Sequence, residues 1–266
     1  MQGPAGRGPR REGTSAAGGR GPARGEDRET YRGPRPDEPD IPATITGDEL
    51  DRGTLNELRT LPEALALKVA RLLVAARLAF EAGDGASARA FVDAAKRRAA
   101  RVAAVRAAAG EIAYATGDFS AALSDLKAAR RIAGGSEYLP MIADCERGLG
   151  HPDRAVALLQ PVLRGRVSDD IRIEALLVVS GARADLGQPE AAVLVLKVPE
   201  LTTLPAGSSR ARLQYAYARC LKKVGRLVEA REWMHRAAAS DLDGATDAQE
   251  VCDEWDGLAF MLEDER

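Results

Sequence analysis

The amino-acid sequence predicts an all-α fold, a solenoid of about five helix hairpins with flanking helices. Three observations support this prediction. A glycine followed five residues later by an alanine recurs five times, first seen clearly in the stretch ATGDFSAAL. The apolar residues between these pairs follow the period of a helix and not the alternation of a strand. Aromatic residues make up only 4% of the 266 residues, which favours closely packed helices over a β-sandwich.

The five glycines are separated by 34, 33, 37 and 38 residues, and an interval of this size indicates stacked helical units. Each unit is predicted to be two antiparallel helices joined by a turn at the glycine. The glycines and the alanines that follow them are Gly83 and Ala88, Gly117 and Ala122, Gly150 and Ala155, Gly187 and Ala192, and Gly225 and Ala230.

The residues of this motif explain how such a turn is made. A glycine adopts the left-handed conformation that ends a helix, and an aspartate after it, as at Asp84 and Asp118, caps the next helix. Pro152 and Pro189 suit the first turn of a helix. Seven residues before each glycine stands another small residue, so two small positions are expected to face each other and let the helices approach closely. These residues are Ala76, Gly110, Ala143, Ser180 and Ala218.

Composition divides the chain into four predicted segments. Residues 1–45 form a Gly/Arg/Pro-rich tail that is expected to be disordered, because it has almost no large apolar residues to bury. The other segments are leading helices at 46–68, the repeat region at 69–241 and an acidic C-terminal helix and tail at 242–266.

The last segment has two interpretations. As a capping helix, it would turn Val251, Trp255 and Leu258 inward and cover the open apolar end of the stack. Alternatively, the stretch WDGLAFMLEDE is a short acidic and apolar ligand for another protein.

Residues that carry chemistry are scarce. His151 and His235 are the two histidines, and the three cysteines Cys145, Cys220 and Cys252 are too widely spaced for a disulfide framework. We therefore expect no enzymatic activity, no metal and no cofactor. No apolar run is long enough to span a membrane and no secretory signal follows the N-terminal arginines, so a cytoplasmic location is expected.

The positions described above resemble the tetratricopeptide repeat (TPR) family, whose unit is a 34-residue helix-turn-helix. The small residues and the alanines fall on that family's small positions, and residues 103–135 match it best. The resemblance implies a right-handed α-solenoid of about five TPR-like hairpins. Two departures stand out: the family's mid-helix aromatic residue is absent, and Pro199 is expected to shorten the second helix of the fourth hairpin.

In this family the first helix of each hairpin lines a groove that binds peptides or helices. The resemblance therefore implies a non-enzymatic protein-protein interaction scaffold with a protein or peptide partner. The groove candidates are Arg77, Glu111, Tyr114, Asp144, Arg147, Asp185, Tyr215, Arg219 and Lys222. The paired lysine and asparagine with which some members clamp a C-terminal carboxylate are missing, since the sole asparagine, Asn56, precedes the repeats.

A second function comes from the N-terminal tail. Residues 1–24 hold five arginines and one glutamate, and Arg-Gly segments bind RNA through charge and stacking. Acidic residues accumulate after residue 24 and Tyr31 is the one aromatic residue available to stack, which makes nucleic acid the less favoured partner. Self-association is a third alternative.

Overall fold

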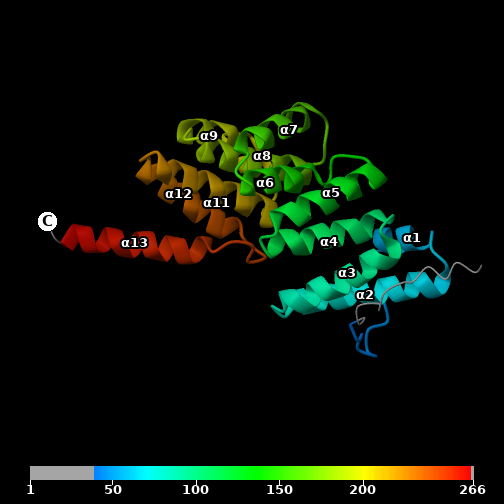
Figure 1. Ribbon diagram of the computed structural model, residues 1–266. Coiled ribbons are helices and arrows are strands. Elements are labelled where there is room, and N and C mark those ends of the chain that lie inside the picture. Colours follow the sequence, from blue (N-terminus) through cyan, green and yellow to red (C-terminus); the bar gives the residue numbers. More distant parts are fainter. Residues whose placement is uncertain (1–38, 265–266) are drawn as a thin grey trace, which may run out of the picture. The chain divides into compact units, whose positions relative to one another are not determined.

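The computed structural model describes residues 39–264, with side chains to Gly257 (Figure 1). The tail residues 1–38, which include the Arg-Gly pairs, lie outside the described residues. The described residues form thirteen helices and no strand, as the all-α prediction requires. The helices are α1 (Arg52–Leu58), α2 (Glu63–Glu81), α3 (Gly85–Ala99), α4 (Ala103–Ala115), α5 (Phe119–Ala133), α6 (Leu139–Gly148), α7 (Pro152–Arg164), α8 (Asp169–Asp185), α9 (Pro189–Leu196), α10 (Glu200–Thr203), α11 (Ser208–Lys223), α12 (Leu227–Ser240) and α13 (Ala248–Asp264).

Five pairs of helices pack as hairpins: α2 with α3, α4 with α5, α6 with α7, α8 with α9, and α11 with α12. The turn glycines all have a positive φ, from 72° at Gly187 to 83° at Gly150. Asp84 and Asp118 each accept a backbone N–H of the following helix, at 2.9 Å and 3.0 Å. The turn chemistry read from the sequence is therefore confirmed.

The small positions lie at the contact between the two helices of each hairpin. All five alanines after the glycines are at most 1% exposed, and the small residues of the first helices are buried as well. A Cβ atom added at Gly110 would lie 2.6 Å from Leu126 Cγ of the paired helix. In the fourth hairpin, Ser180 Oγ donates to the carbonyl oxygen of Ala192 at 3.1 Å. The backbones thus approach so closely that larger side chains would not fit.

The fourth hairpin is irregular at the predicted place. Helix α9 has eight residues and ends at Leu196, shortly before Pro199. The chain then forms the short helix α10. Its residue Leu201 is buried, and the Leu201 carbonyl oxygen accepts a hydrogen bond from Gln214 Nε2 at 2.7 Å. A packed connector therefore replaces the missing turns of the second helix.

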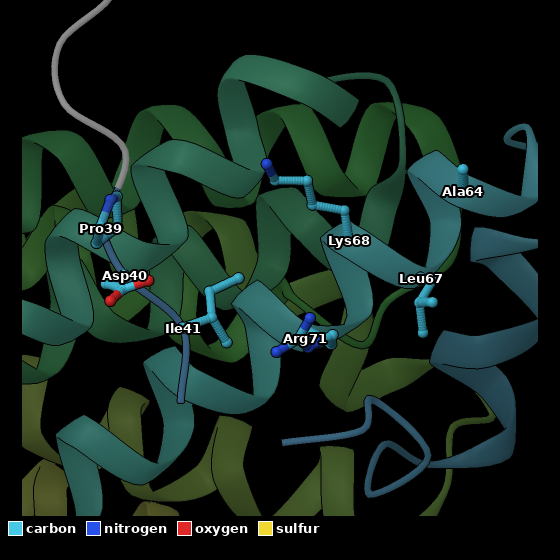
Figure 2. Close-up of a pocket in the computed structure, with 7 residues that line it drawn as sticks. All are labelled: Pro39, Asp40, Ile41, Ala64, Leu67, Lys68 and Arg71. Atoms are coloured by element: carbon cyan, nitrogen blue, oxygen red, sulfur yellow. The ribbon is translucent and has the colours of Figure 1, made fainter. Parts of the chain in front are cut away.

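Residues 39–45 pack against α2, although their composition had placed them in the tail (Figure 2). Ile45 is 6% exposed. Arg71 holds the segment, since its Nε donates to the Ile45 carbonyl oxygen at 2.8 Å and its Nη2 to that of Pro42 at 3.2 Å. Ile41, Ile45 and the two hydrogen bonds from Arg71 therefore join this segment to α2, although the tail as a whole has few large apolar residues.

Helix α13 packs on α12 at the other end of the described chain. Val251 and Cys252 are buried with Met234 and Ala237, and Trp255 lies at the edge of this cluster. These contacts support the interpretation as a capping helix, which stays a prediction until the stability of variants in α13 is measured. The side chain of Leu258, the third residue predicted to face inward, lies outside the described side chains.

One added methyl group at position 110 should destabilise the chain. Overpacking against Leu126 costs about 1–3 kcal/mol, while alanine gains about 0.5–1 kcal/mol over glycine in a helix. We expect Gly110→Ala to lower the free energy of unfolding by up to about 2 kcal/mol in urea titrations. In a Leu126→Ala background the same change should be neutral or stabilising. An equal loss in both backgrounds would contradict the proposed contact.

A charge introduced on the buried face of α13 should reveal how much that helix stabilises the stack. Val251→Asp removes a buried apolar side chain and introduces an unpaired carboxylate, a loss of about 3 kcal/mol or more. We expect the thermal midpoint to fall by about 6–12 °C, measured by circular dichroism. Glu254→Gln, at an exposed position of the same helix, should change it little. An unchanged midpoint for Val251→Asp would mean that α13 does not cover the core.

Candidate functional site

Three clefts follow the first helices of the hairpins. The first cleft, of about 470 Å³, lies between α1, α2 and α4 and includes Tyr138. The second, of about 630 Å³, is lined by α4, α6, α8 and α11 together with Glu137. The third, of about 420 Å³, lies between α8, α11 and the segment before α13. The second and third clefts share Leu177 and Arg212, and the first and second meet at the neighbouring residues 137 and 138.

The cleft walls follow the register of the repeat. Ten positions before each turn glycine stands a residue that lines a cleft: Leu73, Ala107, Pro140, Leu177 and Tyr215. Because each hairpin ends its first helix at the same kind of turn, equivalent positions point to the same side of successive units. The clefts are therefore a direct product of the repeat.

The predicted groove residues are distributed over these clefts, with three exceptions. Six line a cleft: Arg77 and Glu111 the first, Tyr114, Asp144 and Arg147 the second, and Tyr215 the third. Asp185, Arg219 and Lys222 line none of the three and instead contact neighbouring side chains. Asp185 pairs with Arg147, Arg219 lies 5.9 Å from the ring centroid of Tyr215, and Lys222 Nζ lies 4.1 Å from that of Trp255.

Four of the predicted residues form one hydrogen-bonded network. The Tyr114 hydroxyl donates to Asp144, whose other oxygen accepts from Arg147 Nη1 at 2.5 Å. Arg147 Nε then donates to Asp185 Oδ2 at 2.6 Å. Burial and the Asp144 carboxylate raise the pKa of Tyr114 well above its usual value. The network links α4, α6 and α8, so these side chains hold successive first helices together as well as lining the cleft.

Sequence reasoning missed a second set of cleft residues. Arg212 of α11 forms two hydrogen bonds with the carboxylate of Glu174 of α8, and Glu137 lines the same cleft. Each of these three residues stands thirteen positions before its turn glycine, as 212 stands before 225. The repeat period therefore contained the signal that could have found them.

Negative charge dominates the cleft walls, although the whole chain has a net charge of only −2. Three basic residues line the clefts, and each is paired with an acid: Arg77 with Glu81, Arg147 with Asp144 and Asp185, and Arg212 with Glu174. Eight acidic residues line them, namely Asp51, Glu57, Glu111, Glu137, Asp144, Asp170, Glu174 and Asp247. The excess of acids makes the clefts suited to a cationic ligand.

The cysteine and histidine side chains that could carry out chemistry are wholly or partly buried, or lie beside carboxylates of the chain itself. Cys145 is fully buried, and burial raises the pKa of its thiol to about 11, which makes it a poor nucleophile. His151 Nδ1 lies 3.5 Å from Glu146, and His235 Nε2 lies 3.3 Å from Asp256. In the part of the chain that the structure describes, no group of three His, Cys, Asp or Glu side chains is placed to hold a metal ion. None of the described helices is both long and apolar enough to cross a bilayer.

The packing of the hairpins and the clefts along their first helices define a helical-repeat fold of the TPR type. Two solved structures share it: nearly identical TPR-like repeats from a kinesin light chain-like protein of Podosopora anserina, and a single-substitution variant of that protein. The first is 19% identical with a TM-score of 0.50 and covers 64% of this chain and 92% of its own. The variant is 18% identical with a TM-score of 0.52 and covers 72% of this chain and 97% of its own.

At these identities the likeness concerns the fold alone. No protein-family model matches the chain, and no curated protein matches it.

Loss of the Arg147 guanidinium should destabilise the stack more than loss of an ordinary surface arginine. Arg147→Met breaks contacts to two carboxylates on different helices, and we expect the free energy of unfolding to fall by about 1 kcal/mol or more. Arg77→Met is the matched control, because it removes a single exposed pair within one helix, a loss of about 0.3–0.5 kcal/mol. Equal losses in urea titrations would mean that the network does not join the helices.

Proposed function

We propose that the chain is a non-enzymatic interaction protein that binds an extended segment or helix of a partner protein in the three clefts. The single observation that carries this proposal is the alignment of the clefts with the first helices of successive hairpins. A ligand that follows them would contact equivalent positions of each unit, which is how a repeat surface gains affinity from a long segment.

Two features of the clefts suit a protein ligand. Their walls combine apolar side chains, such as Leu73, Leu177 and Val178, with hydrogen-bonding groups. Their acidic character disfavours the phosphate backbone of a nucleic acid. RNA association through residues 1–24 would have to use a part of the chain outside the described residues.

A pair of matched variants tests where the ligand binds. Peptides selected with the full chain from a phage-displayed random library should bind in solution, measured by fluorescence polarisation. Leu177→Arg, in the wall shared by two clefts, should weaken binding by at least about tenfold. Leu194→Arg should leave the affinity unchanged, since Leu194 is 69% exposed on α9, a second helix of its hairpin.

Circular dichroism should show both variants folded, because the acids near Leu177 can accommodate an arginine. Failure of any peptide to enrich, or loss of binding in the Leu194 variant alone, would refute the proposed function.

A further inference from the structure

Tyr138 stands among three carboxylates at the junction of the first and second clefts. It is half-buried, lines the first cleft, and immediately precedes α6. Burial is the main cause that raises the pKa of its hydroxyl, and the charges of Glu57, Glu137 and Glu111 raise it further. A tyrosine ring surrounded by negative charge is a favourable place for an organic cation.

One of these three carboxylates forms a hydrogen bond within the protein, and the other two form none among the described residues. Glu57 Oε2 accepts the N–H of Ala104 at 2.8 Å and so satisfies the start of α4. Glu111 and Glu137 have neither an ion pair nor a hydrogen bond through their side chains among the described residues. Burial alone raises the pKa of Glu111, with no lowering by a neighbouring cation. Arg77, the one arginine of this cleft, is bonded to Glu81 instead.

Apolar side chains form one wall of the first cleft. Leu73 and Phe80 of α2 face Ala104, Ala108 and Ile112 of α4 across it. Phe80 is 41% exposed, so its ring is accessible to a ligand. The cleft therefore offers an apolar wall directly beside an uncompensated negative charge.

We propose that the first cleft binds a segment of a partner protein in which an arginine or lysine stands near an apolar residue. The cation stacks on Tyr138 and pairs with Glu111, and the apolar side chain packs against Phe80 and Ile112. Charge complementarity selects this partner over an acidic peptide or a nucleic acid. This inference rests on the proposed function and specifies the ligand at one end of the groove.

The probe is a set of synthetic glycine-serine peptides that each carry one leucine and one arginine, with spacings from adjacent to one helical turn. Matched peptides replace the arginine with citrulline, which keeps its shape without the charge, or with glutamate. Affinities for the full chain are measured by fluorescence polarisation at low salt. At the best spacing, the arginine peptide should bind about tenfold more tightly than its citrulline analogue.

Variants of the chain test whether the preference for arginine over citrulline arises in the first cleft. Glu111→Gln and Tyr138→Leu should each reduce the arginine-to-citrulline ratio to nearly one, while Glu250→Gln, an exposed acid of α13, should leave it unchanged. Glu111→Gln should also raise the thermal midpoint at neutral pH. Because the pKa of Glu111 is raised on folding, its ionisation lowers stability once the pH exceeds that pKa.

Three results would overturn the inference: no binding by any arginine peptide, no preference over citrulline, or a full preference retained in Glu111→Gln. Library peptides that depend on Leu177 would in those cases still support the proposed function. A preference for the glutamate peptide would reverse the assigned charge of the partner.

Discussion

Everything in this fold depends on the close approach of two helix backbones within each hairpin. That approach requires small side chains at matched positions, because a Cβ at Gly110 would already overlap Leu126 and the five alanines of the second helices are almost completely buried. It also requires a glycine with positive φ at each turn, since the chain must reverse within a few residues. With these two conditions met, the first helices are presented in one register and equivalent positions along them line the clefts.

A different interaction joins one hairpin to the next. An ion pair crosses every junction: Lys96 with Asp125, Lys127 with Glu146, Arg147 with Asp185, Arg212 with Glu174, and Arg231 with Asp256 of α13. Glu146 occupies a mid-helix position where the TPR pattern has an aromatic residue, and its hydrogen bond from Lys127 lowers its pKa. Partly exposed pairs contribute about 0.2–1 kcal/mol each. They therefore favour one arrangement of neighbouring units, while apolar burial supplies most of the stability.

The two kinds of contact differ in how well the sequence predicts them. The turn glycines, the small positions and the shortening of α9 before Pro199 follow from single residues at a fixed period, so they could be predicted. The ion pairs join residues 19 to 38 positions apart, and no single register contains them all. For the same reason Arg147 could be predicted as a groove residue while its bond to Asp185, 38 positions away, could not. Ile45 was missed because composition averages over a segment that one arginine holds in place.

The distribution of acids along the clefts distinguishes structural charges from those that have no structural partner. Asp144, Asp185 and Glu174 neutralise the arginines that tie the helices together, and Glu57 satisfies the start of α4. Glu111 has none of these tasks, yet it places a carboxylate against apolar walls, where ionisation is unfavourable. A glutamine would fit the same space without that penalty. Glu111 is exposed to solvent at the first cleft and has no ion pair or side-chain hydrogen bond among the described residues, so its carboxylate is available to the basic side chain of the proposed partner.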